Sequence, residues 1–489
     1  MAETATVVSV VMAALLGVAS VAVLVVAAFK HPKVTAGLLV VLIMLSQTIQ
    51  TVTGIPALGY GDELGVILAL LLFTGRRLYV HGSVRAYPAL WFFLAFAVLG
   101  SISSVVNTVP MGVMATGAFL FLKGPILGFA VAQLDWTKRD LPNVARFGAC
   151  VVGFVLAITA INAVAPAAWN SVIGRVASVS ERGGFSSLTG PFDHPVGLGT
   201  TMSMAFLAIL LYRQLVAKGP VSLVLLIGSG LACIAAFRRK SIAAGIITAL
   251  AVRAVLPGPK AMYFAAVAIL LPVALVLGRE PLTQVVTGTV DEYTANVAET
   301  ARVLMTLEGL ALALASFPLG VGFGRYASFT ASENYSPLYE DRGYQWIYGM
   351  GRGDMGGFLS DTFWPAPLAE TGILGGLCYA AALFLLVVPA WRMMRRAPER
   401  HVRWAGAVTL AWMLTLTIES VVAPVFVSPP MFGLPFVAAG VCTSLTARES
   451  VMESPAKHHD DAHSAAGGSI DSAEATPHVP WAAGGVSRA

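Results

Sequence analysis

The feature that most constrains this chain is the repetition of apolar runs, each about 17–25 residues long. Such runs cross a bilayer as helices, because a helix satisfies its own backbone hydrogen bonds where water is absent. Only 12% of the 489 residues are charged, whereas a soluble domain carries about 25%. The sequence therefore predicts an all-α, polytopic transmembrane helix bundle with about 12–13 spans, and it excludes water-soluble enzyme folds. The runs lie near residues 7–29, 34–53, 58–75, 88–106, 111–133, 143–165, 195–212, 219–237, 240–257, 260–278, 367–391, 403–421 and 427–446.

Basic residues predict how the bundle is oriented. Lys and Arg gather in the loops 76–85, 213–218 and 392–403, which places these loops in the cytoplasm. Segment 279–366 then lies on the opposite side. We expect a multi-pass protein of the inner (cytoplasmic) membrane with this large loop extracytoplasmic. The net charge of +5 fits loops that face anionic lipid, and nucleic acid is not an expected partner.

Four segments follow from this pattern. They are N-terminal transmembrane helices (1–278), a periplasmic or extracellular loop domain (279–366), C-terminal transmembrane helices (367–446) and a disordered cytoplasmic tail (447–489). Helical periodicity from Asp291 to Ser316 favours a folded, helical loop over a linker. The four cysteines lie in apolar stretches without ligand spacing, so no metal site is predicted.

Two sets of basic residues depart from the pattern. Arg238, Arg239 and Lys240 occupy an outward-facing turn. They indicate either a miscounted span or an anion site at the membrane edge, since arginine binds phosphate through a bidentate fork. Lys123 falls inside a predicted span, where a charge is costly; it either pairs within the bundle or contacts a lipid phosphate.

The loop domain holds the remaining candidates. Arg302 lies in the predicted helix, three residues after Glu299, and a surface ion pair is the simpler interpretation. The helix ends at a glycine-rich turn, Phe317-Pro318-Leu319-Gly320-Val321-Gly322-Phe323-Gly324. Aromatic side chains are frequent between 335 and 364, which fits either sugar stacking or anchoring at the membrane interface.

Four stretches together resemble the O-antigen ligase and O-antigen (exopolysaccharide) polymerase family of membrane glycosyltransferases. They are Arg302 with the glycine-rich turn that follows its helix, Leu368–Gly375 (Leu-Ala-Glu-Thr-Gly-Ile-Leu-Gly), Arg238–Ser241, and Gly190–Gly199 ahead of a helix. The resemblance covers roughly residues 180–390.

The resemblance implies an enzyme of polysaccharide biosynthesis without a cofactor. Family members act on glycans carried by polyprenyl pyrophosphate: a polymerase extends the lipid-linked chain, and a ligase moves it to lipid A core or another acceptor. The implied chemistry is inverting glycosyl transfer, and a flippase and a chain-length regulator are implied partners. The leaving pyrophosphate needs fixed positive charge, for which the candidates are Arg238, Arg239, Arg302 and Arg325.

The chain departs from the ligases at one position. Their His-Asn pair, about nine residues before the Glu that corresponds to Glu370, is replaced by Asp361-Thr362. This favours a polymerase. Asp361 is either a base or a helix N-cap. His194 is an alternative base or simply a turn residue before Pro195, and Glu370 is expected to stabilise the N-terminus of its own helix.

A transporter of an anionic or amphipathic solute is the competing interpretation. Transporters are often built from internal repeats with paired broken helices. The polar residues of this chain concentrate instead in one external loop, which favours the glycosyltransferase.

Overall fold

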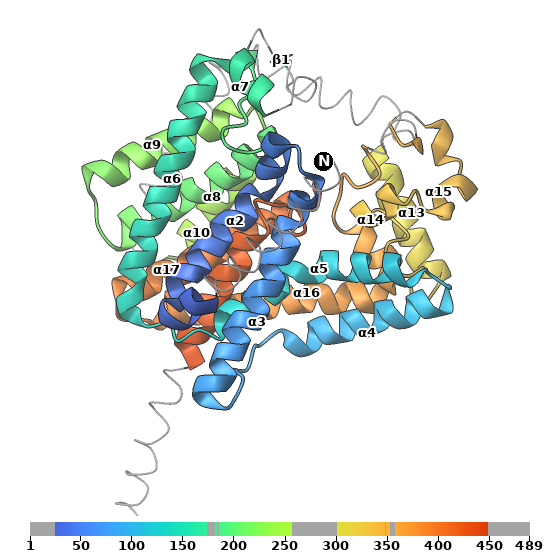
Figure 1. Ribbon diagram of the computed structural model, residues 1–489, viewed down its shortest axis with the longest axis horizontal. Helices are drawn as coiled ribbons and strands as arrows, with labels where there is room; N and C mark the ends of the chain where they lie inside the picture. The colour runs from blue at the N-terminus through green and yellow to red at the C-terminus, as the bar shows by residue number, and fades with distance from the viewer. Residues whose placement is uncertain are drawn as a thin grey trace, which may run out of the picture. The chain divides into compact units, whose positions relative to one another are not determined.

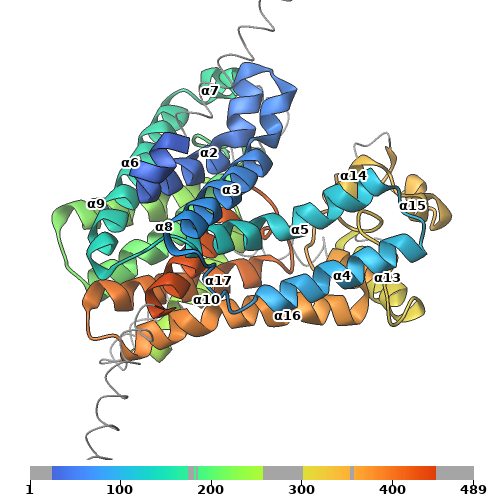
Figure 2. The same cartoon turned by 60° about the horizontal axis from the view of Figure 1, so that its bottom comes forward.

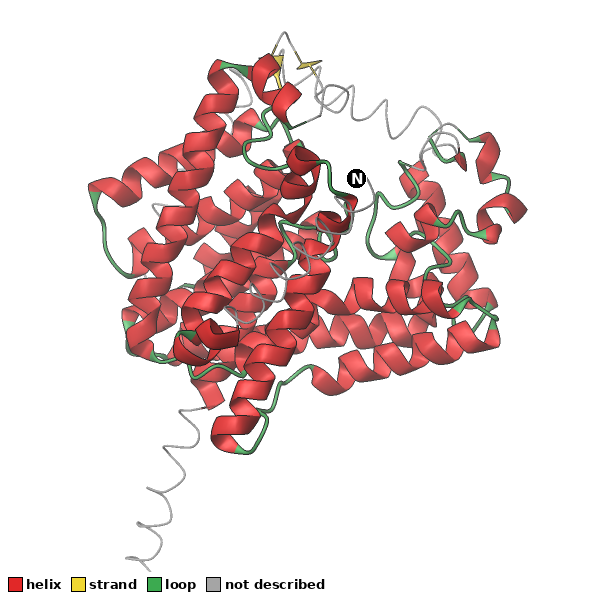
Figure 3. Ribbon diagram, in the orientation of Figure 1, coloured by secondary structure: helices red, strands yellow, loops and turns green. Residues whose placement is uncertain are grey.

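The helical prediction is confirmed by a computed structural model, which describes residues 25–173, 181–182, 185–256, 301–347, 349–352 and 357–447. Apart from an antiparallel pair of two-residue strands, β1 (Glu181–Arg182) and β2 (Phe185–Ser186), all regular structure in these residues is helical (Figure 3). Contacts divide the chain into two units, Met1–Thr446 and Ala447–Ala489. Helices α2 to α17 and both strands belong to the first unit.

Helices coincide with the predicted apolar runs from 34–53 to 240–257 and from 367–391 onward. They are α2 (Pro32–Thr53), α3 (Gly61–His81), α4 (Leu90–Val106), α5 (Met111–Ala132), α6 (Leu141–Val164), α7 (Pro166–Val172), α8 (Pro195–Leu215), α9 (Pro220–Ala235), α10 (Arg239–Val255), α13 (Ala301–Ala315), α14 (Phe329–Glu333), α15 (Pro337–Asp341), α16 (Pro365–Arg396) and α17 (Arg400–Glu419), with the 3-10 turns η1 (Pro56–Tyr60), η2 (Lys138–Asp140) and η3 (Tyr344–Trp346). A last helix, Gly433–Ala447, follows α17.

Among the described residues, six stretches are long and apolar enough to cross a membrane: Pro32–Thr53, Ala57–His81, Met111–Ala132, Lys138–Val164, Pro195–Leu215 and Pro365–Arg396. Three shorter apolar helices accompany them, Leu90–Val106, Pro220–Ala235 and Gly433–Ala447. These helices indicate a membrane protein. The predicted span 260–278 and most of 7–29 lie outside the described residues, and the predicted total of about thirteen stays a prediction.

Part of the predicted loop domain packs on three of the apolar helices. Helix α16 lies against α4, and α4 against α5. Helix α13 contacts α16 and α14 contacts α5, so α13, α14 and α15 gather at one end of this group (Figures 1 and 2). The predicted helix from Asp291 to Ser316 is present as α13 from Ala301, and its earlier residues lie outside the described part.

An aromatic core joins these pieces. Phe323 of the glycine-rich turn packs edge-on against Phe96 of α4, and Phe363 contacts both Phe121 of α5 and Tyr379 of α16. Phe96, Phe121, Phe323, Phe363 and Tyr379 are each at most 1% exposed. Burial of rings this large contributes strongly to packing, which fixes the turn and the segment before α16 against the bundle.

Lys123 of α5 pairs within the bundle. Its ammonium donates to Asp62 Oδ2 at 2.6 Å and to Glu63 Oε1 at 3.1 Å, both in the first turn of α3. The ammonium also lies 5.0 Å from the centre of the Phe432 ring. We call Asp62, Glu63 and Lys123 the α3–α5 charge cluster. It settles the alternatives for Lys123 in favour of an internal ion pair.

Arg85, in the connection between α3 and α4, bonds to residues from distant parts of the chain. Its Nη1 donates to the carbonyls of Ala132 and Leu134 and to the hydroxyl of Ser444, at 2.7, 2.7 and 2.5 Å. Its Nη2 reaches Asp135 Oδ1 at 3.1 Å. One buried guanidinium thus ties residues from the first, second and last parts of the bundle.

Candidate functional site

Five helix ends or adjoining segments meet where the candidate residues lie. They are the first turn of α13, the segment before α16, the first turns of α8 and α10, and the last turn of α17. Lys240 lies within electrostatic reach of Glu419, Asp361, Arg302 and Arg238. We call these five residues the cationic site; it holds three cations and two carboxylates from four separate parts of the chain.

The most direct contact in the site joins the loop helix to the segment before α16. Arg302 Nη2 donates to Asp361 Oδ2 at 2.6 Å, and the two side chains are 31% and 32% exposed. Glu299, the alternative partner for Arg302, lies outside the described residues. A charge-assisted hydrogen bond of this length is strong, and its partial exposure leaves it accessible to a solute.

The packing of α13 on α16 sets this ion pair. A Cβ on Gly309 would lie 3.1 Å from the Pro365 side chain, and a Cβ on Gly320 would overlap the main chain of Ala369–Gly372. Only a residue without a side chain permits such close approach. The two glycines therefore fix the register of α13 along α16, and this register carries Arg302 to Asp361.

Asp361 does not cap a helix. Helix α16 begins at Pro365 with Trp364 at the N-cap, and no side chain caps its first turn. The N-cap interpretation of Asp361 is therefore wrong. The segment is held instead by Ser420, whose carbonyl accepts from the Phe363 amide at 3.2 Å and whose hydroxyl accepts from Trp364 Nε1 at 2.9 Å.

Glu419 belongs to the site although it was not predicted. Its Oε2 accepts from Thr200 at 2.7 Å and from Ser241 at 3.3 Å. The residue is 1% exposed, and Oε1 is buried without a hydrogen-bond partner among the described residues. The sequence did carry a signal, because Glu419 is the single acidic residue of the apolar run 403–421 and such residues mark functional or paired positions.

The basic run Arg238–Lys240 lies where α9 is followed by α10, and the number of spans around it stays a prediction. Helix α9 ends at Ala235, Phe237 has a φ of 51°, and α10 starts at Arg239 with Arg238 at its N-cap. A Cβ on Gly199 would lie 3.3 Å from the Arg238 Cβ, so the start of α8 closes over this turn. Arg239 is the exposed member of the basic run.

His194 has a structural role at the start of α8. Its Nδ1 accepts from the Val196 amide at 3.1 Å, and Pro195 follows at the first helical position. His194 is thus the turn residue before Pro195, which was the alternative to a role as general base. The cap orients the first turn of α8, which carries Thr200 toward Glu419.

Glu370 braces the glycine-rich turn. It is fully buried, and its Oε1 accepts from Ser328 Oγ at 2.7 Å and from the Tyr326 amide at 3.1 Å. The expectation that Glu370 stabilises the N-terminus of α16 is therefore wrong. The side chain of the candidate Arg325 is half-buried.

The tyrosines of the loop domain form its core. Tyr339 and Tyr344 stack with ring centres 5.5 Å apart, and the Tyr344 hydroxyl meets that of Tyr326 at 2.8 Å. Burial raises the pKa of Tyr326, Tyr339 and Tyr344, so all three are neutral at ordinary pH. These side chains are not available for sugar stacking. Trp346 is 85% exposed, so its ring is available for sugar stacking.

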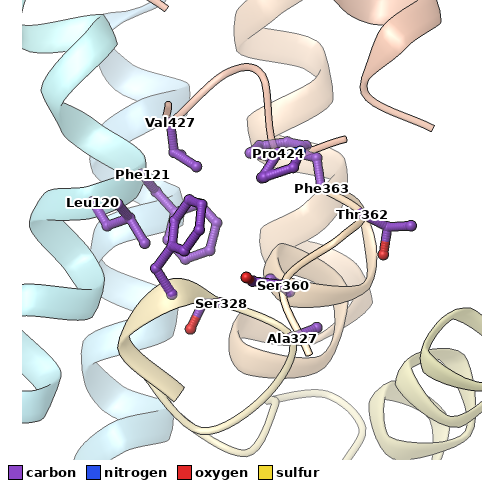
Figure 4. Close-up of a pocket in the computed structure, with 11 residues that line it drawn as sticks. Leu120, Phe121, Ala327, Ser328, Ser360, Thr362, Phe363, Pro424 and Val427 are labelled. Atoms are coloured by element: carbon purple, nitrogen blue, oxygen red, sulfur yellow. The ribbon is translucent and has the colours of Figure 1, made fainter. Parts of the chain in front are cut away.

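A small, mainly apolar pocket lies beside the cationic site. Its wall includes Ser360 and Thr362, which flank Asp361, together with Phe121 and Ser328 (Figure 4). The Ser360 hydroxyl points toward the pocket, whereas the Thr362 side chain points away from it (Figure 4).

No family model matches the chain, and no curated protein matches it either. The described residues contain no group of three or more His, Cys, Asp or Glu side chains arranged to hold a metal ion.

Proposed function

We propose that the protein polymerises oligosaccharide repeats carried on polyprenyl pyrophosphate into a cell-surface polysaccharide. The observation that carries the proposal is the convergence of Arg238, Lys240 and Arg302 around Asp361 and Glu419. A pyrophosphate leaving group needs fixed positive charge. A membrane-bound donor needs that charge beside apolar helices, as it is here.

Arg302 is proposed to bind the donor pyrophosphate through its guanidinium fork. Its present partner, the Asp361 carboxylate, occupies the position that a phosphate oxygen would take. Donor binding therefore displaces Asp361 from Arg302. The released carboxylate then becomes available as general base, so that base activation depends on a loaded donor.

In the transfer step, the acceptor hydroxyl oxygen forms a bond to the anomeric carbon of the donor sugar. The bond from that carbon to the pyrophosphate oxygen breaks, and its electron pair leaves with the polyprenyl pyrophosphate. The hydroxyl proton passes to Asp361. Attack opposite the leaving group inverts the anomeric centre, and Arg302, Arg238 and Lys240 stabilise the negative charge that develops.

The test compares glycan chain length in cells that carry the wild type, Arg302→Ala or Asp361→Ala at equal membrane abundance. Loss of long chains with accumulation of single lipid-linked repeats is expected. Lys138→Ala is the matched control, because Lys138 pairs with Glu399 at 3.0 Å on the surface, with both side chains 45% exposed. This variant should leave chain length unchanged.

Two results would overturn the proposal. Full-length lipid-linked polymer that accumulates untransferred would assign a ligase. An unchanged glycan profile after complete deletion would favour a transporter of an anionic or amphipathic solute.

A further inference from the structure

Helix α13 exposes one continuous face that carries no charge. Along this face Leu307, Leu310, Leu314 and Phe317 are 61%, 45%, 59% and 61% exposed. The other exposed residues between 306 and 318 are Thr306, Ala311, Ala315 and Pro318. A helix facing water normally carries charged or polar residues on its exposed side, so this face is built for another environment. We call Leu307, Leu310, Leu314 and Phe317 the α13 apolar face.

The polar groups of α13 are satisfied internally. Thr306 Oγ1 donates to the Arg302 carbonyl, and Ser316 Oγ donates to the Leu312 carbonyl. The one charged residue in this stretch, Glu308, pairs with Arg342. Hydroxyls that bond back to their own helix, and a carboxylate that is paired with Arg342, leave no unpaired polar group on the apolar face for water to bind.

Described residues 333–352 of the same predicted loop domain have the opposite character. Glu333, Glu340, Asp341, Arg342 and Arg352 are all exposed. Arg352 and Glu340 pair at 3.3 Å with side chains 70% and 55% exposed. One compact part of the chain therefore presents an uncharged side on α13 and a charged side around α15, which is the amphipathic arrangement of a structure seated at a membrane boundary.

We infer that the α13 apolar face lies in the acyl region of the bilayer. The helix contacts α16, one of the stretches able to cross the membrane, and α16 itself exposes Leu374 and Leu377. The apolar surface therefore continues from a candidate span onto α13.

This inference stands independently of the proposed function. It places Arg302, which precedes this face on the same helix, at the water–lipid boundary. A phosphate attached to a membrane lipid is then accessible to Arg302 without extraction of the lipid tail.

The experiment uses the full chain in phosphatidylcholine vesicles, with Cys150 and Cys378 replaced by alanine to remove the more accessible native thiols. Single cysteines are introduced at Leu310→Cys and, as the matched control, Asp341→Cys, and each is labelled with an environment-sensitive fluorophore. Quenching is measured with nitroxide groups on lipid acyl chains and with aqueous iodide. We expect at least a several-fold preference for lipid quenching at 310 and for iodide at 341.

Equal iodide quenching at both positions would overturn the inference and place α13 in water. A label at 310 that neither agent reaches would also overturn it, because the face would then be covered by protein such as a second copy of the chain. Replacing Leu314 in place of Leu310 provides a second position if L310C fails to fold.

Discussion

The chain places charged side chains among apolar helices in two different ways. The Lys123–Asp62 ion pair of the α3–α5 charge cluster is sealed: its two side chains are 3% and 1% exposed, and Glu63, at 29% exposed, contacts Lys123 from the edge of the cluster. In the cationic site, the Arg302–Asp361 pair is about one third exposed. A sealed group serves the fold alone, whereas an open pair can exchange a protein partner for a ligand.

Replacement of Lys123 should therefore have the largest effect on folding. Lys123→Met leaves the Asp62 carboxylate buried without its cation, which costs about 3–5 kcal/mol for a buried pair. We expect a strong fall in the thermal stability of the detergent-solubilised protein. Asp62→Asn combined with Lys123→Met should recover part of the loss; a single variant as stable as the wild type would show that the cluster is not sealed.

Glu419 lies between the two extremes, because it is buried like the sealed cluster but belongs to the open site. Glu419→Ala removes acceptors from Thr200 and Ser241 and should cost about 1–3 kcal/mol. Glu419→Gln should retain one hydrogen bond and lose less stability. If long glycan also disappears in Glu419→Gln at equal membrane abundance, the carboxylate charge itself serves the site beside Lys240.

Replacement of Arg302 should affect function strongly and stability little, the opposite of replacement of Lys123. Its ion pair with Asp361 is partly exposed, so Arg302→Ala should change stability by at most about 1 kcal/mol. Long glycan should nevertheless be lost, and Arg302→Lys should restore it only in part, since lysine lacks the planar fork. Thermal unfolding and chain-length profiles of the same membranes separate the two effects. Full polymerisation by Arg302→Ala would contradict the proposed role.

The smallest effect on stability is expected at Asp135. Partial burial alone would raise the pKa of its carboxyl, but neighbouring positive groups lower the pKa by more. The hydrogen bond from His81 and the positive charges of Arg85 and Arg77 hold the pKa of Asp135 below 3.8. The folded state therefore binds its proton less readily than the unfolded state. This stabilisation is present at neutral pH and is lost as the pH falls below about 3.8 through the folded value.

The check is the melting temperature of the wild type and Asp135→Asn between pH 7 and pH 3. The wild type should lose more stability than the variant over the acidic end of this range, by less than about 1 kcal/mol. Parallel curves would show that Asp135 does not contribute to the acid sensitivity.

The two kinds of charged group also differ in how far the sequence could predict them. Helices were predictable because apolar run length and helical period are local properties. The approach of Arg302 to Asp361 was not, because it depends on the register that Gly309 and Gly320 impose between α13 and α16. Glu419 stood out as an isolated acid, but its partners Thr200 and Ser241 come from two other helices. Long-range packing decided each of these contacts.

Arg85 has a consequence for how the chain is assembled during synthesis. Its guanidinium contacts the carbonyls of Ala132 and Leu134, but the Ser444 hydroxyl is 359 residues further along the chain. Once the nascent chain has been synthesised as far as residue 135, Arg85 can form most of these contacts, but its last partner, Ser444, has not yet been made. The Arg85 guanidinium in the N-terminal part of the bundle therefore lacks one hydrogen-bond acceptor until the final helix inserts. A nascent chain truncated before Gly433 should be recognised by membrane quality control, even though every predicted span before it is complete.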